Sequence, residues 1–201
     1  MSAQTVSDTP SASTGLDALA AAVKAVRGPP PVHLWNPPFC GDLDMRIGAD
    51  GTWYYMKTPI GRPALVKLFS SVLKVEDGKF FLVTPVEKVG IVVDDAPFAA
   101  VEMRVEGEGH ARRIGFRTQT EEWVEVAADH PLRFEKEAGT EGLKPYVLLR
   151  GALWARVSRA LFHDLASMGE IAVHDGSEWF GLYAGGRFYP MVPAQEIEGL
   201  L

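Results

Sequence analysis

A strict alternation of charged and apolar residues runs through residues 42–47, D-L-D-M-R-I. Successive side chains of a strand point to opposite faces, so the apolar side chains of this stretch share one face and the charged ones share the other. The stretch 48–51 (GADG) is a turn signal, and 52–56 (TWYYM) is rich in residues that favour strands. The pattern therefore predicts a β-hairpin with one charged face.

Three other stretches favour helices. Residues 17–27 are rich in alanine, and Gly28, which precedes three prolines, predicts the end of this helix. Apolar residues recur at helical spacing in 63–74 (PALVKLFSSVLK). Residues 152–168 (ALWARVSRALFHDLASM) carry a broad apolar stripe and predict one long helix that ends at Gly169.

Most of the remaining chain is predicted to be strand. Short apolar runs joined by polar turns together indicate an antiparallel meander. These runs are 79–84, 86–93, 99–105, 112–117, 123–126, 132–135 and 145–150, followed by two hairpins within 171–192.

The segment 29–41 (PPPVHLWNPPFCG) combines five prolines with large apolar side chains. Proline disfavours helix and holds the residue before it in an extended conformation. We therefore expect an extended strap whose Leu34, Trp35 and Phe39 side chains are buried in the core.

A short motif recurs along the chain. Asp-Gly is followed within a few residues by paired aromatics at 50–54, 77–81 and 175–180, and the last two copies each follow a predicted helix. A simpler explanation is open, because Asp-Gly is a favoured turn before any strand. If the repeat is structural, the fold is α+β, with two small domains built from duplicated helix-plus-antiparallel-sheet units.

The length of 201 residues suits two such domains. We expect a disordered tail at 1–14, because it is too poor in apolar residues to offset the entropy of ordering. An N-terminal α+β domain is expected at 15–95. A C-terminal β-rich domain is expected at 96–201, containing the long helix 152–168.

Composition places the chain among ordinary globular proteins, with 47% apolar and 23% charged residues. A net charge of -6 and a pI near 5.4 argue against binding of long nucleic acid by general electrostatic attraction. The single cysteine, Cys40, cannot form an internal disulfide, and no apolar run reaches the roughly 18 to 20 residues that span a bilayer. Since the start of the chain has no secretory signal pattern, we expect a cytoplasmic protein that does not bind membranes.

The familiar catalytic and cofactor motifs are missing from the sequence. It contains no GxGxxG after a strand, GxxxxGK[ST], HExxH, GxSxG or paired CxxC. No catalytic residue and no cofactor are therefore predicted, and the balance is against an enzyme. Asp94 and Asp95 are interpreted as solvated turn charges.

Asp42 and Asp44 are the residues best placed to hold a metal, because the alternation puts both carboxylates on one strand face. His33 and Cys40 precede them, but these residues lack the spacing of zinc ligands. No metal site is predicted, and a metal-dependent hydrolase that uses the two aspartates stays open as an alternative.

Cationic residues form a more suggestive pattern. On the predicted long helix, Arg156, Arg159 and His163 stand at i, i+3 and i+7 and make a basic ridge. The other cations that could join an anion site are Arg62, Lys67, Lys88 and Arg150. A structural explanation competes with this one, because surface Arg and Lys commonly cover apolar neighbours or pair with carboxylates.

Several motifs carry a resemblance to a known family: CGDLDMRI, DGTWYY, PIGR, LVKLF, LVTPVEK and DDAPF, with PYVLLRGALWARVSRALFHDLASMG further on. The chain resembles, over about residues 35–170, the bacterial family called domain of unknown function 1285. The resemblance implies a duplicated two-domain α+β fold whose C-terminal half is superficially similar to a pleckstrin-homology barrel. It also implies a nucleotide-like ligand at the interface of the domains and a role in signalling. It brings no catalytic residues.

These observations together predict a protein that binds a small anionic, nucleotide-like ligand. Guanidinium groups suit phosphate because they can donate two hydrogen bonds at once. Trp53 or Tyr54 would stack on a base. The predicted ligand-binding residues are Arg62, Lys67, Lys88, Arg150, Arg159, Trp53, Tyr54, Asp42 and Asp44. The alternatives are the hydrolase and a protein-interaction module with a protein partner in signalling.

Overall fold

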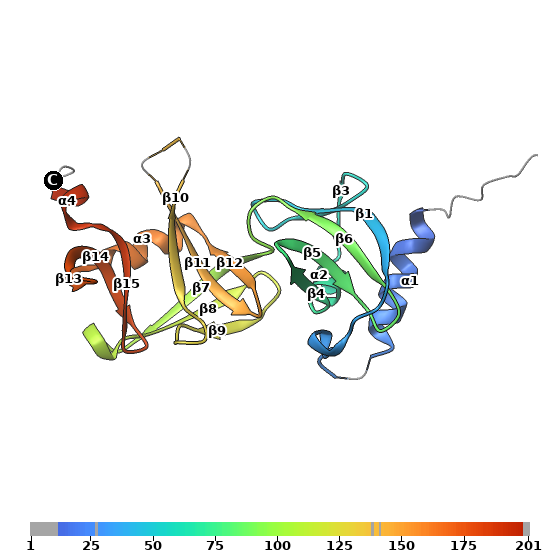
Figure 1. Ribbon diagram of the computed structural model, residues 1–201, viewed down its shortest axis with the longest axis horizontal. Helices are drawn as coiled ribbons and strands as arrows, with labels where there is room; N and C mark the ends of the chain where they lie inside the picture. Colours follow the sequence, from blue (N-terminus) through green and yellow to red (C-terminus); the bar gives the residue numbers. More distant parts are fainter. Residues whose placement is uncertain (1–11, 27, 138, 141, 199–201) are drawn as a thin grey trace, which may run out of the picture. The chain divides into compact units, whose positions relative to one another are not determined.

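The computed structural model describes residues 12–26, 28–137, 139–140 and 142–198 (Figure 1). The helices are α1 (Ala12–Lys24), α2 (Pro63–Ser70), α3 (Arg159–Ser167) and α4 (Ala194–Glu198), with 3-10 turns η1 (Val32–Leu34) and η2 (Gly109–Ala111). The strands are β1 (Phe39–Ile47), β2 (Trp53–Tyr55), β3 (Thr58–Pro59), β4 (Leu73–Glu76), β5 (Lys79–Val83), β6 (Lys88–Val93), β7 (Phe98–Glu106), β8 (Arg113–Thr118), β9 (Trp123–Glu125), β10 (Leu132–Lys136), β11 (Leu143–Arg150), β12 (Leu153–Val157), β13 (Glu170–His174), β14 (Ser177–Ala184) and β15 (Arg187–Pro193).

The strands form three sheets. Two have six strands, in the orders β3-β2-β1-β6-β5-β4 and β10-β11-β12-β7-β8-β9, and the third has the order β13-β14-β15. Neighbours are joined mostly by antiparallel hairpins, whereas β12 runs parallel to β7, with Ala155 opposite Phe98. This parallel pair departs from the predicted meander, because the chain must return across the sheet before β12 can lie beside β7.

The chain divides into two compact units. The first joins the described residues up to Leu43 with Ile60–Ile91, and the second joins Asp44–Pro59 with the described residues from Val92 onward. The β1–β2 hairpin, with Met45 opposite Tyr55, belongs to the second unit. Its turn fits closely there, because Gly51 has a φ of 83° and a Cβ at this position would lie 3.1 Å from Gln119.

The duplication predicted from the Asp-Gly motifs is confirmed. The segments α2-β4-β5-β6 and α3-β13-β14-β15 have the same order of helix and three antiparallel strands. Both place Asp-Gly in the first hairpin turn, where Asp77 and Asp175 have φ values of 50° and 49° and each following glycine is also left-handed. Asparagine, aspartate and glycine tolerate this conformation best, so the motif marks two equivalent two-residue turns.

The core of each unit follows from the apolar patterns. In the first unit, α1 and α2 contribute buried residues that include Leu19, Val23 and Phe69. In the second unit, the alternation of β1 buries Met45 and Ile47 while the intervening charged residues stay exposed, as predicted.

The predicted long helix 152–168 is wrong in its first half. Residues 153–157 form β12, where Leu153, Ala155 and Val157 are buried and the residues between them are half-buried. Helix α3 starts only after Ser158, which is its N-cap and whose backbone is still extended. The apolar residues of 153–157 alternate with a period of two, and they also match part of a helical apolar stripe. Pairing with β7 and β11 decides in favour of the strand.

Three other predictions differ from the structure. The helix predicted at 63–74 ends at Ser70, and its last residues begin β4. The aromatic strap is not inserted in the core, because Leu34 is 72% exposed, Phe39 is also exposed and Trp35 is half-buried. Helix α1 begins at Ala12, so it takes in the last residues of the predicted tail, whose residues 1–11 lie outside the described part.

Within the part of the chain that the structure describes, no helix has the length and apolar character needed to cross a membrane.

Candidate functional site

A basic cavity lies beside the junction of β12 and α3. Its volume is about 480 Å³, and Arg156, Arg159 and His163 all line it. These residues were predicted to share one helical ridge, but Arg156 projects from the strand and the other two from the helix. The strand-to-helix turn therefore brings together the same three side chains that the sequence grouped for a different reason.

Arg156 is held in place by a partly buried network. Its Nη1 lies 3.0 Å from Oδ2 of Asp95, and the Tyr146 hydroxyl donates to Oδ1 of Asp95 at 2.6 Å. Burial and the bond to the Asp95 carboxylate raise the pKa of the Tyr146 hydroxyl well above its usual value. Asp95 is thus not the solvated turn charge predicted from sequence, since its side chain is 17% exposed and orients Arg156.

Arg159 and His163 form the more open side of the cavity. Both side chains are exposed, and they stand four positions apart on α3, so they lie on the same face of the helix. No carboxylate pairs with either of them among the described residues. Glu137 is the opposing charge in the lining, and its Oε1 lies 3.6 Å from Lys144.

The cavity also has an apolar side. Phe162 lines it between the two basic positions of α3, and its ring centroid lies 6.4 Å from that of Phe134. Pro145 and Val157 in the lining are buried. A lining that combines a few cationic groups with apolar ones is what small-molecule sites commonly present to a polar ligand.

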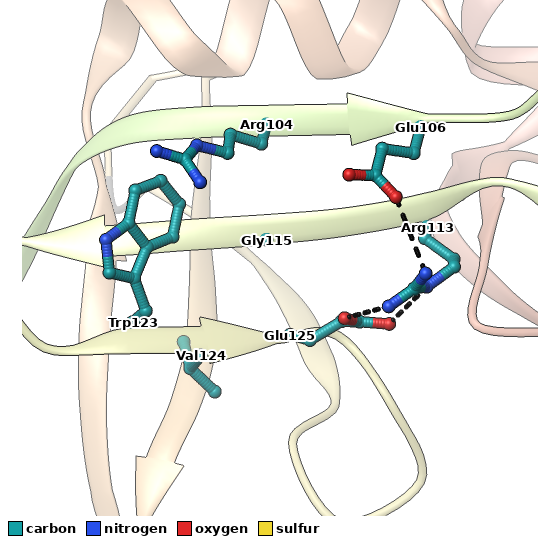
Figure 2. Close-up of a pocket in the computed structure, with 7 residues that line it drawn as sticks. All are labelled: Arg104, Glu106, Arg113, Gly115, Trp123, Val124 and Glu125. Atoms are coloured by element: carbon teal, nitrogen blue, oxygen red, sulfur yellow. Dashed lines mark hydrogen bonds and ion pairs between the residues drawn. The ribbon is translucent and has the colours of Figure 1, made fainter.

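A second hollow, of about 360 Å³, lies on the face of β7, β8 and β9 (Figure 2). Gly115 in the central strand has no side chain, which leaves the hollow open. Figure 2 shows Arg104 beside Trp123, with the guanidinium carbon 4.2 Å from the ring centroid. Such cation–π contacts hold a guanidinium over a ring.

The other charges of this second hollow are one arginine and two glutamates, which form ion pairs with each other. Figure 2 shows Arg113 between Glu106 and Glu125, and its Nη2 lies 2.7 Å from Oε2 of Glu125. The bonds from Arg113 hold the pKa of the Glu125 carboxyl below its usual value. This hollow is therefore a ladder of paired charges on an exposed sheet face, and it is a weaker candidate for an anion than the cavity at α3.

The predicted cations of the first unit lie at the start of α2, within α2 and at the start of β6. Arg62 is exposed immediately before α2, and Lys67 is exposed on α2 beside a groove that Lys24 also lines. Lys88 is engaged elsewhere, because its Nζ lies 2.6 Å from Oε2 of Glu76.

Arg150 of the second unit is also engaged. Its Nη1 donates to Oε2 of Glu122 at 2.5 Å, and its guanidinium lies 5.1 Å from the Phe98 ring centroid. Among the five cations predicted to bind the ligand, Arg159 is the one that lines the basic cavity. The location of the ligand at a domain interface stays a prediction of the sequence resemblance.

The two residues predicted to stack on a base differ in accessibility. Trp53 is 1% exposed, so its ring is part of the core and offers no open face to a ligand. The hairpin alternation could have indicated this, because Trp53 pairs with the buried Ile47. Tyr54 is half-buried, and the guanidinium carbon of Arg46 lies 5.8 Å from its ring centroid.

Asp42 and Asp44 lie on one exposed face of β1, as the alternation predicted. The Asp42 carboxylate lies against Gly90, where a Cβ would overlap it. Among the described residues no group of three or more His, Cys, Asp or Glu side chains could hold a metal ion. Cys40 is exposed, and its thiol lies 3.4 Å from the carbonyl oxygen of Pro38.

Comparison with known proteins identifies both halves of the chain. Residues 30–96 match the family model "Domain of unknown function (DUF1285), N-terminal domain", and residues 97–191 match "Protein of unknown function (DUF1285), C-terminal domain". None of the curated proteins matches the chain.

Two crystal structures are similar to this structure. A DUF1285 family protein from Silicibacter pomeroyi DSS-3, determined at 2.50 Å resolution, is 48% identical with a TM-score of 0.82, and the match covers 90% of this chain and 97% of that one. A DUF1285 family protein from Shewanella baltica OS155, determined at 1.40 Å, is 27% identical with a TM-score of 0.51, and the match covers 63% and 92% of the two chains.

Proposed function

This chain belongs to the DUF1285 family, and from that premise we propose that it binds a small anionic, nucleotide-like ligand in a signalling role. The observation that supports the proposal is the meeting of Arg156, Arg159 and His163 around one cavity. We place this binding in the cytoplasm, where a lone cysteine is ordinarily kept reduced.

The chemistry of the cavity favours a phosphorylated ligand. A guanidinium presents a planar fork of N–H donors that fits two phosphate oxygens at once. Asp95 orients Arg156 before any ligand arrives, so little conformational entropy is lost there on binding. Among the described residues no carboxylate forms an ion pair with Arg159, and the Glu137 carboxylate in the lining lies 3.6 Å from Lys144, so the charge of Arg159 is available to the ligand.

The size and apolar side of the cavity favour a base or a similar flat group beside the phosphate. Small-molecule sites occupy roughly 300–1,000 Å³, and this cavity falls within that range at about 480 Å³. Phe162 offers an aromatic surface next to the two basic side chains of α3. The signalling role would follow if the ligand binds one conformation better than another and so shifts their populations.

The proposal is tested by thermal unfolding with a ligand panel of nucleoside mono-, di- and triphosphates, adenosine and inorganic phosphate. Ligand at one hundred times its Kd stabilises by about 2.7 kcal/mol, which raises the Tm of a chain of this size by roughly 5–11 °C. We expect a nucleotide to give such a shift, and adenosine to give a much smaller one because it lacks the charge.

Two arginine variants make the test specific. Arg159→Ala should abolish most of the shift, whereas Arg187→Ala removes an exposed arginine that does not line the cavity and should leave the shift intact. No shift with any nucleotide at millimolar concentration would contradict the proposal. An equal shift in Arg159→Ala and wild type would contradict the assignment of the cavity.

A further inference from the structure

The third sheet has an exposed apolar edge. Strand β13 is its first strand, pairs only with β14 among the described strands, and lies at the outer side of the sheet in Figure 1. Ile171 is 53% exposed and Val173 is 73% exposed. Edge strands are ordinarily protected by lysine, proline or a bulge, and the sequence of β13, E-I-A-V-H, contains neither lysine nor proline.

These two side chains continue the face of the sheet that forms the core. Ile171 lies opposite Phe180, and two residues further along β14 the same face carries Leu182, which is fully buried. Val173 shares that face with Ile171 because they are two residues apart. The core face of this sheet therefore extends past the core at β13, where the described residues leave it uncovered.

The backbone of the same edge is ready to pair. His174 and Ser177 flank a two-residue turn, so they form a hydrogen-bonded pair. Along the hairpin such pairs alternate with pairs that are not hydrogen-bonded to each other. Ala172 and Glu170 thus direct their N–H and C=O groups to β14. The N–H and C=O groups of Ile171 and Val173 point the other way, toward the free edge.

The duplicated unit provides an internal comparison. Strand β4 occupies the position of β13 in the first copy, between the helix and the Asp-Gly turn. The turn η1 packs against β4, and Lys74 of β4 donates from Nζ to the carbonyl oxygen of Trp35 at 3.2 Å. The chain covers this strand in one copy, whereas no described segment covers it in the other.

We propose that β13 pairs antiparallel with β13 of a second copy of this chain, about a two-fold axis at Ala172. In this register Ile171 of one copy lies opposite Val173 of the other, and the pair exchanges both backbone hydrogen bonds. The axis repeats this pair, so all four outward-pointing N–H and C=O groups of each strand are satisfied. The exposed apolar side chains of the two copies meet on one face.

Hydrogen-bond complementarity between a carboxylate and an imidazole N–H selects a second copy as the occupant of the edge. The same register places Glu170 of one strand opposite His174 of the other, twice, in the close spacing of a non-hydrogen-bonded pair. An acid at one end of the strand and a histidine at the other make the edge complementary to itself when it is reversed. The interface is small, so the dimer is weak and depends on concentration.

Sedimentation velocity of the full chain over micromolar to millimolar concentrations tests the proposal. We expect a monomer–dimer equilibrium that Val173→Lys abolishes. The control is Val92→Lys, which places the same charge at a valine that is 59% exposed on another strand, and it should dimerise as wild type does. A monomer at every concentration overturns the proposal, as does a dimer that survives Val173→Lys or is lost in both variants.

A disulfide tests the register directly, in a Cys40→Ser background that removes the native thiol. The proposed axis places the two Ala172 Cα atoms about 4.5 Å apart, so Ala172→Cys should form a covalent dimer on mild oxidation. The two Val173 Cα atoms would be about 8 Å apart, beyond disulfide reach, so the more exposed Val173→Cys should cross-link far less. Equal or reversed yields would overturn the register, and a binding partner other than a second copy would give no cross-link at Ala172.

Discussion

Replacing Asp95 by asparagine should destabilise the protein by about 2 kcal/mol. The Asp95 carboxylate accepts from the Tyr146 hydroxyl at 2.6 Å and from Arg156 Nη1 at 3.0 Å, and its side chain is 17% exposed. An asparagine can still accept from Arg156 Nη1 through its amide oxygen and donate from its NH2 group to the Tyr146 oxygen, so the substitution removes the negative charge that faces Arg156. Breaking a buried ion pair by removing one partner's charge costs about 3–5 kcal/mol, and the partial exposure of Arg156 and Asp95 lowers the expected cost to about 2 kcal/mol.

The assay is thermal unfolding at neutral pH, followed by circular dichroism. A chain of this size loses about 2–4 °C of Tm per kcal/mol, so Asp95→Asn should melt roughly 4–8 °C below wild type. The control is Asp129→Asn at an exposed aspartate, which should change the free energy of unfolding by less than about 0.5 kcal/mol. If Asp95→Asn has the same Tm as wild type, Asp95 does not hold Arg156 in place, and the network does not set the geometry of the cavity.

Alkaline pH should weaken the fold, because burial raises the pKa of both Tyr146 and Tyr189 above the value of about 10 that they have when unfolded. The stabilisation that comes from burying these two tyrosines in their neutral form is fully present below pH 10 and is lost as the pH rises above 10. Tyr146→Phe should therefore flatten the decline of Tm that is measured above pH 10. Gly181→Ala should lower the free energy of unfolding measured in urea by more than about 2 kcal/mol, because a Cβ would overlap the backbone of the neighbouring strand. In contrast, Gly15→Ala in α1 meets no other atoms and should raise the free energy of unfolding by about 0.5–1 kcal/mol. If Gly15→Ala were the less stable variant, this packing would be wrong. Phe162→Ala should weaken nucleotide binding about tenfold in calorimetry while leaving the response to inorganic phosphate unchanged, and an equal loss for both would remove the aromatic surface from the account.

The local pattern was sufficient where one periodicity was unambiguous. The alternation of 42–47 fixed β1, its buried face and its exposed aspartates, and the Asp-Gly turns indicated the duplicated hairpins. In 153–157 the apolar residues satisfied both a period of two and a helical stripe, and only pairing with β7 and β11 decided the structure. Such pairing is a tertiary effect that no local window contains.

The candidate site shows the same limit. Arg156, Arg159 and His163 were grouped by helical spacing, and they line one cavity because a strand ends where a helix begins. Asp95, which holds Arg156, lies 61 residues away in sequence, and its role depends on contacts that spacing cannot indicate.

Amide chemical-shift mapping of the isotope-labelled protein during titration with a nucleoside monophosphate is the decisive test of nucleotide binding at the α3 cavity. We expect saturable shifts centred on Arg159, Phe162 and His163, which shrink in Arg159→Ala and persist in Arg187→Ala. Shifts centred on any other part of the protein, or none at millimolar nucleotide, would contradict it.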